Sequence, residues 1–113
     1  MPRLAERRRH SRTAISCPTV IRDTCGRVLQ HGRAVDIAPC GIRVVGPSGL
    51  PIRDGQQVWV EMSVPRLRAS GPKMRIVKLR GEVRRVQIMG AWRSVIVVLF
   101  ETDFSPRLLD PTL

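Results

Sequence analysis

The chain has 113 residues, enough for one domain with a single modest core and too few for two. It carries 20 basic against 9 acidic residues, a net charge of +11, and all but two of the basic residues are arginine. Arginine binds phosphate and guanine through a planar fork of donors, so this charge predicts an anionic partner. A general preference for arginine over lysine on a solvated surface would give the same composition.

Several classes of protein are disfavoured by the sequence. The three cysteines, Cys17, Cys25 and Cys40, lie at no metal-ligand or CxxC spacing, so we expect free thiols and a cytoplasmic location. No apolar run approaches the 18 or so residues of a membrane span, and we expect no membrane insertion. Neither His10 nor His31 has a partner at a catalytic or metal-binding spacing. We therefore expect no enzyme and no metal site.

Residues 1–13 carry many arginines without an apolar period. Such a segment cannot bury enough apolar surface to fix its own structure, so we expect a flexible arm. Period-two alternation begins at Ala14, and the first predicted strand runs to Ile21, with Pro18 indicating an edge or a bulge. A turn over Asp23–Gly26 leads into the next strand, which we expect to begin at Arg27.

Residues 28–45 form a predicted hairpin, because two alternating runs flank the polar turn Asp36–Gly41. Asp36 would cap its own turn or offer a carboxylate at a strand end, and Gly41 would permit a positive φ or the close approach of a ligand. Beyond the turn, Ile42 and Val44 resume the apolar alternation. On the incoming strand, one face is expected to carry Leu29, His31, Arg33, Val35 and Ile37.

The remaining patterns also predict strands. Val58–Val64 alternates cleanly, and a longer strand over residues 77–88 changes phase at Arg84-Arg85, which indicates a β-bulge. Ser94–Phe100 is apolar on both faces and is the predicted best-buried strand. Glycine-containing turns are expected at Asp54-Gly55 and Gly90. We therefore predict an all-β domain over residues 14–103, a barrel or sandwich of six or seven antiparallel strands, and a tail over 104–113 with at most a short helical turn.

Two short motifs suggest a family. Arg8-x-x-x-Arg12 and Asp36-x-Ala38-x-x-Gly41, separated by one predicted strand, resemble the two-part signature of the PilZ domain family, RxxxR and (D/N)xSxxG. That family binds the bacterial messenger cyclic di-GMP. The resemblance covers residues 6–105 and implies a small antiparallel β-barrel, usually with a longer carboxy-terminal helix than this tail allows. The resemblance implies a ligand site formed by Arg7, Arg8, Arg12, Asp36, Ala38 and Gly41. It implies no cofactor.

The chemistry of these residues suits the ligand. Arginine forks pair with phosphate oxygens or with the O6/N7 edge of guanine, and a carboxylate accepts from the opposite edge of the base. Arg7 before the motif accompanies a stacked pair of ligand molecules in the family. Ala38 departs from the pattern, because the family usually has serine there. Without the serine hydroxyl, one hydrogen bond to a charged phosphate is lost, which would weaken the binding free energy by about 1.5–3 kcal/mol.

The sequence therefore predicts a messenger receptor that passes its signal to an unidentified protein partner. Two alternatives stay open. One is a PilZ-like domain that contacts proteins without a ligand, because Ala38 weakens the binding motif. The other is a basic nucleic-acid-binding barrel, which the charge of +11 would suit, although aromatic residues make up only 4% of the chain and leave few platforms for bases.

Overall fold

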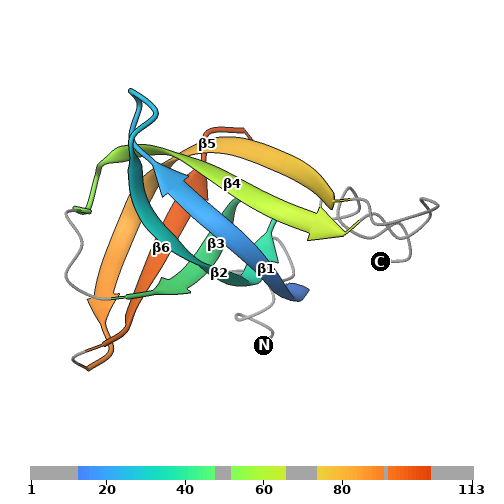
Figure 1. Cartoon of the computed structure of the whole chain (residues 1–113). Helices are drawn as coiled ribbons and strands as arrows, with labels where there is room; N and C mark the ends of the chain where they lie inside the picture. The colour runs from blue at the N-terminus through green and yellow to red at the C-terminus, as the bar shows by residue number, and fades with distance from the viewer. Residues whose placement is uncertain (1–12, 48–51, 66–73, 91, 103–113) are drawn as a thin grey trace, which may run out of the picture.

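Six antiparallel strands make up most of the computed structural model, which describes residues 13–47, 52–65, 74–90 and 92–102. They close into one barrel in the order β1-β2-β3-β6-β5-β4 (Figure 1). No helix lies within these ranges. The predicted all-β barrel is confirmed, with the smaller of the two expected strand numbers. The strands are β1 Thr13–Arg22, β2 Val28–Ala38, β3 Gly41–Gly46, β4 Gln57–Pro65, β5 Met74–Ile88 and β6 Ser94–Phe100.

The core shows the predicted period most clearly in β4. Val58, Val60 and Met62 are fully buried, while Trp59 and Glu61 point outward, as the alternation predicts. Each strand contributes its inward residues to one cluster inside the barrel. Their burial removes apolar surface from water and is the main favourable term for this fold.

The predicted facing of β2 is wrong. Leu29 and Ile37 are buried, but His31 and Arg33 are exposed and Val35 is half-buried. Register shifts against β1 and β3 show one extra residue on β2 near each end of this run. Each β-bulge reverses the direction of the side chains that follow it. The inward residues between the two bulges are therefore the even-numbered ones, such as Gln30 and Ala34.

The predicted bulge in β5 is confirmed, because the register against β6 shifts between Val83 and Arg85. The prediction for β6 is wrong in part. Its inward residues are buried, but Val95 and Val97 are half-buried and Leu99 is exposed. The barrel wall is a single sheet, so alternate residues of a strand must face outward. The outer face of β6 is apolar.

The turns follow the sequence closely. Gly26, Gly55 and Gly90 each have a positive φ, in the turns expected around them. Pro18 lies near a register shift between Ala14 and Cys17, in the part of β1 that precedes its pairs with β4, which run from Thr19 to Arg22. A proline is tolerated there because β2 is its one strand neighbour.

Residues 1–12 of the predicted arm lie outside the described residues, and its last residue, Thr13, begins β1. The predicted tail over 104–113, with the helical turn at Ser105-Pro106, also lies outside them. Within the described ranges, no helix is long and apolar enough to cross a membrane.

Candidate functional site

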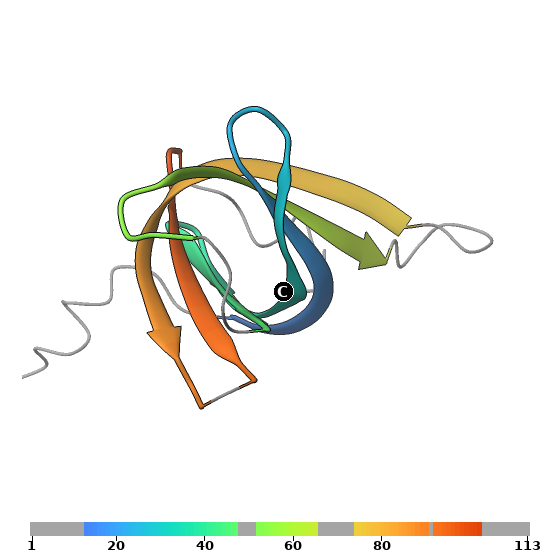
Figure 2. The same ribbon diagram turned by 60° about the vertical axis from the view of Figure 1, so that its left-hand side comes forward.

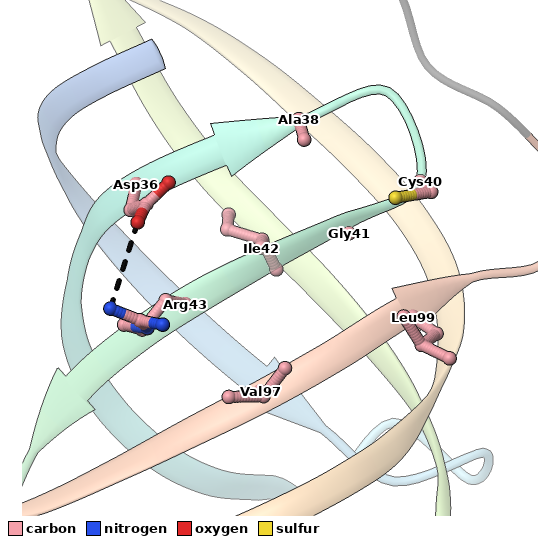
Figure 3. A pocket seen from close by; sticks show the side chains of 8 residues that line it. All are labelled: Asp36, Ala38, Cys40, Gly41, Ile42, Arg43, Val97 and Leu99. Atoms are coloured by element: carbon pink, nitrogen blue, oxygen red, sulfur yellow. Dashed lines mark ion pairs between the residues drawn. The ribbon is translucent and has the colours of Figure 1, made fainter. Parts of the chain in front are cut away.

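A shallow hollow lies on the outer face of the barrel, where the β2–β3 turn meets β6 (Figure 3). It has a volume of about 90 Å³. Three of the predicted ligand residues, Asp36, Ala38 and Gly41, border it together. The other three, Arg7, Arg8 and Arg12, lie outside the described residues. The full lining is Asp36, Ala38, Cys40, Gly41, Ile42, Arg43, Val97 and Leu99.

Asp36 lies in a strand, which corrects the prediction that the turn begins there. β2 runs on to Ala38, which pairs with Gly41, so the hairpin turns over two residues. Asp36 pairs across the hairpin with Arg43. Its Oδ2 lies 3.7 Å from Nη1 of Arg43, and both side chains are partly exposed (Figure 3). The carboxylate and the guanidinium thus stand side by side at one end of the hollow.

Gly41 has a structural reason to be glycine that the sequence did not reveal. Of the two predicted alternatives, a positive φ or the close approach of a ligand, the first is wrong, because the φ of Gly41 is not positive. A Cβ at this position would lie 2.7 Å from the carbonyl oxygen of Val98. Glycine therefore lets β3 approach β6. Ala38, across the turn, is buried, and its methyl group borders the hollow at the position where the family usually has serine (Figure 3).

Arg43 is the main residue that sequence reasoning missed. The two-residue turn places it directly across from Asp36, and the (D/N)xSxxG pattern ends before it. Val97 and Leu99 were assigned to the core, yet they form an apolar wall of the hollow. A carboxylate acceptor, a forked cationic donor and an apolar wall can receive a flat polar ring or an anion.

A second, wider hollow lies on the same outer face, nearer the β5–β6 turn. Its volume is about 480 Å³. Arg43 and Val45 are two residues apart on β3, so the two hollows are neighbours along one strand. We call this second one the basic hollow; it is lined by His31, Gly32, Arg33, Val35, Val45, Gly46, Pro47, Trp92 and Arg93.

The cysteines within the described residues are free thiols, with Cys17 buried and Cys25 and Cys40 exposed. Cys40 lies at the rim of the first hollow. No group of three histidine, cysteine or acidic side chains suited to a metal ion occurs in the described part of the chain.

Comparison with solved structures identifies two similar folds. The first is the structure of Bacillus subtilis inhibitor of motility (MotI/DgrA), with a TM-score of 0.68 and 18% identity over 91% of this chain; the match spans 47% of that chain, about half its length. The second is the PilZ domain with c-di-GMP of YcgR from Escherichia coli, with a TM-score of 0.64 and 14% identity over 94% of this chain and 88% of that one. At these identities the likeness shows the fold alone.

No curated protein matches the sequence. The family model described as PilZ domain matches residues 6–109, nearly the whole chain and almost the span over which the two motifs suggested it. This chain belongs to the PilZ domain family.

Proposed function

We propose that this chain is a receptor module for cyclic di-GMP, which binds over the first hollow and is held there by the arginine arm. The observation that carries the proposal is the convergence of Asp36, Ala38 and Gly41 on one hollow. The start of β1 lies next to it. Thr13 pairs with Ile37, and Ala14 pairs with Asp36. The arm is therefore joined to the barrel one strand spacing, about 5 Å, from the hollow.

The size of the hollow indicates how the ligand is held. Pockets that enclose a small ligand typically measure about 300–1,000 Å³. The first hollow, at about 90 Å³, is far smaller. It can accept one edge or face of a dinucleotide but cannot surround it. The rest of the ligand needs a cover, and the arm, which joins the barrel at Thr13 beside the hollow, could provide one.

The arm has the reach and the chemistry for this role. Arg12 precedes Thr13 by one peptide bond, and Arg8 lies five residues from Thr13, a reach of up to about 17 Å. Both guanidinium groups can then fork onto phosphate or onto the O6/N7 edge of guanine. Arg7 would add a third cation beside them. Together the arginines would neutralise the two phosphates, and this pairing would order the arm over the ligand.

Within the hollow, the pair of Asp36 and Arg43 would orient the base. The carboxylate accepts from the donor edge of guanine, while the guanidinium turns toward an acceptor or a phosphate. Val97 and Leu99 offer an apolar surface to the face of the ring. The change in the arm would then be read by a protein partner. This role is one of binding and relay, with no chemical step.

Ala38 supports one alternative, a domain of this family that contacts proteins without the messenger. A methyl group stands where a hydroxyl would bond the ligand. The loss of one such bond weakens binding about 10- to 150-fold. Several arginine contacts of similar strength would outweigh it, which is why we favour the receptor.

Calorimetric titration with cyclic di-GMP tests the proposal. We expect binding by the wild type, and a loss of at least about 30-fold for Arg8→Ala and for Arg12→Ala, equal to about 2–5 kcal/mol. Arg12→Lys should restore part of the loss, because it keeps the charge and not the fork. Arg53→Ala, an exposed arginine away from both motifs, is the control and should bind as the wild type does.

The titration also separates the two alternatives. Silence of the wild type and of Ala38→Ser at millimolar ligand would refute the receptor. Silence of the wild type alone, with binding restored by Ala38→Ser, would show a barrel that has lost the messenger but kept the frame of its site.

A further inference from the structure

Apolar side chains project from the end of the β5–β6 hairpin. Trp92 is 87% exposed, Ile88 60% and Met89 52%. A single exposed apolar side chain is normal, but several large ones exposed at one place typically mark a contact surface. In both Figure 1 and Figure 2 the β5–β6 turn is the lowest of the coloured segments, at an extremity of the barrel. It can therefore meet a flat surface before the rest of the barrel does.

The same hairpin is strongly basic. Residues 83–100 contain no acidic residue and three arginines, Arg84, Arg85 and Arg93. The ion pairs found among the described residues involve other cations, such as Arg22 and Arg80. Asp54 lies near the hairpin, where its Oδ1 accepts the backbone N–H of Val86 at 3.1 Å. The end of the hairpin thus combines apolar side chains with positive charge.

The basic hollow lies beside this turn. Trp92 and Arg93 form one wall of it, and His31 and Arg33, exposed on β2, form another. No acidic side chain is among the described residues that line it. A hollow with two guanidinium groups in its walls favours a phosphate or another anion. It is separate from the lining of the first hollow.

We infer that the β5–β6 turn docks the domain on an anionic membrane surface. Trp92, Ile88 and Met89 enter the headgroup region, and Arg93 pairs with a lipid phosphate at the basic hollow. Tryptophan is enriched at this interface, because its ring is apolar and its N–H finds a polar partner. Arg84 and Arg85 lie four and three residues before Ile88 on β5, about 10–13 Å along the strand, and both are exposed. Their attraction to the surface is therefore weaker per residue than that of Arg93 at the turn.

A membrane surface suits this geometry better than two other anionic partners. Single-stranded nucleic acid is held by several stacked aromatic rings, and among the described residues that line the basic hollow only Trp92 and the smaller ring of His31 could stack on a base. A small anionic ligand would occupy the basic hollow but would leave Ile88 and Met89, which lie outside its lining, in water. A bilayer covers all three apolar side chains and meets all three arginines at once.

The test uses the emission of Trp92. Trp59→Phe leaves Trp92 as the sole tryptophan of the full-length chain. With vesicles of equal parts phosphatidylcholine and phosphatidylglycerol, we expect co-sedimentation and a blue shift of the emission. With phosphatidylcholine alone, or with the anionic vesicles at high salt, binding should be weak. The arginine arm would also attract anionic vesicles, so the blue shift, and not sedimentation alone, decides.

Matched variants locate the contact. In sedimentation, Trp92→Ser should weaken binding at least about tenfold, whereas Ile76→Ser, an apolar residue 56% exposed elsewhere on β5, should not. Arg93→Gln should weaken it about fivefold, and the triple change of Arg84, Arg85 and Arg93 to Gln about 100-fold. Arg27→Gln, exposed in the β1–β2 turn, should have a smaller effect than Arg93→Gln. Circular dichroism verifies that each variant folds.

Four results would overturn the inference. The first is a failure to bind anionic vesicles, and the second is binding without a blue shift of the Trp92 emission. The third is an equal loss of vesicle affinity for the hairpin variants and their controls. The fourth is a response of Trp92 to a single-stranded oligonucleotide when vesicles cause none.

Discussion

Charged side chains have different surroundings on two sides of the barrel's outer surface. On the β1–β4–β5 face, Trp59 lies beneath Lys78 and Arg80, at 5.6 and 5.7 Å from the ring centre. Oε2 of Glu61 forms ion pairs with Nε of Arg22 at 2.8 Å and with Nζ of Lys78 at 3.8 Å. On the β2–β3–β6 face, a hollow separates the turn from β6, and its walls are mostly small or apolar.

The difference supports the proposed ligand site on the β2–β3–β6 side, because the cations of the other side are already engaged. Cations that already stack on a ring or pair with a carboxylate gain little from a new anion, since they must give up those contacts first. Arg43 makes a longer contact, 3.7 Å, and borders open space. Positive charge is spread over the whole chain, but both hollows described above lie on the β2–β3–β6 side. The following variants test this contrast.

Among the variants that test this contrast, Arg43→Ala is expected to have the largest effect, which is on messenger binding. Removing its fork should cost about 1.5–3 kcal/mol, or about 10- to 150-fold in affinity, because a charge-assisted hydrogen bond is lost. Stability should change by less than about 1 kcal/mol, as the pair with Asp36 is partly exposed. Arg80→Ala on the opposite face is the control and should leave affinity unchanged. Equal losses in the two titrations would contradict the contrast between the faces.

Gly41→Ala should lower the free energy of unfolding by about 1–3 kcal/mol, because the new Cβ would press on the carbonyl of Val98. Denaturant titration measures this. Gly81→Ala is a matched variant, since its Cβ would press on the carbonyl of Leu99, also in β6. Both should destabilise the barrel, but only Gly41→Ala should also change the affinity of the folded protein. An unchanged affinity there would mean that the turn does not shape the site.

Ala38→Ser should tighten messenger binding about tenfold, equal to about 1.4 kcal/mol, by adding a hydroxyl beside the ligand phosphate. Calorimetry against the wild type measures the gain. Ala34→Ser, fully buried in the same strand, is the control. It should reduce stability and bring no gain in affinity, because its hydroxyl would face the core. A similar gain from both would show that the effect is not local.

Trp59→Leu should reduce the free energy of unfolding by about 0.5–2 kcal/mol, through the loss of two exposed cation–π contacts. Denaturant unfolding at low and at high salt measures it. Messenger affinity should not move, since Trp59 lies on the face without the hollow. A drop in affinity as large as that of Arg43→Ala would show that the two faces are coupled.

The smallest expected effect depends on pH and concerns Cys17. Burial raises the pKa of its thiol above the ordinary value of 9.0. Below that pH both folded and unfolded chains keep the proton. As the pH rises past it, the unfolded chain ionises first, so stability is lost. Cys17→Ala should remove this part of the alkaline loss in pH-dependent unfolding, whereas Cys25→Ala, at an exposed position, should leave it.

How far the sequence predicts this molecule depends on whether a feature is local. The facing of β4 and the glycine turns follow from neighbouring residues, and both were predicted correctly. The facing of β2 was not, because its bulges arise from the register against β1 and β3. Nothing in the run Leu29–Ile37 marks the two extra residues.

The candidate site divides in the same way. Asp36, Ala38 and Gly41 are close in the chain, so a motif could identify them together. Arg43 required the pairing of β2 with β3, and the wall formed by Leu99 required that of β3 with β6. The motif identified Gly41 as a ligand residue, but its packing against β6 could not be predicted, because Val98 lies more than fifty residues later in the chain.

The barrel is closed by a short seam. β1 pairs with β4 through four residues, Thr19–Arg22, whereas its pairs with β2 extend over the whole strand from Thr13. The first half of β1 therefore has only one neighbouring strand, β2. Separating this half from β2 would break one ladder and expose Cys17, which is buried in the core, while the pairs with β4 would keep the barrel closed. A force on the amino-terminal end would act first on this half of β1, which starts beside Asp36, before it reached the pairs with β4.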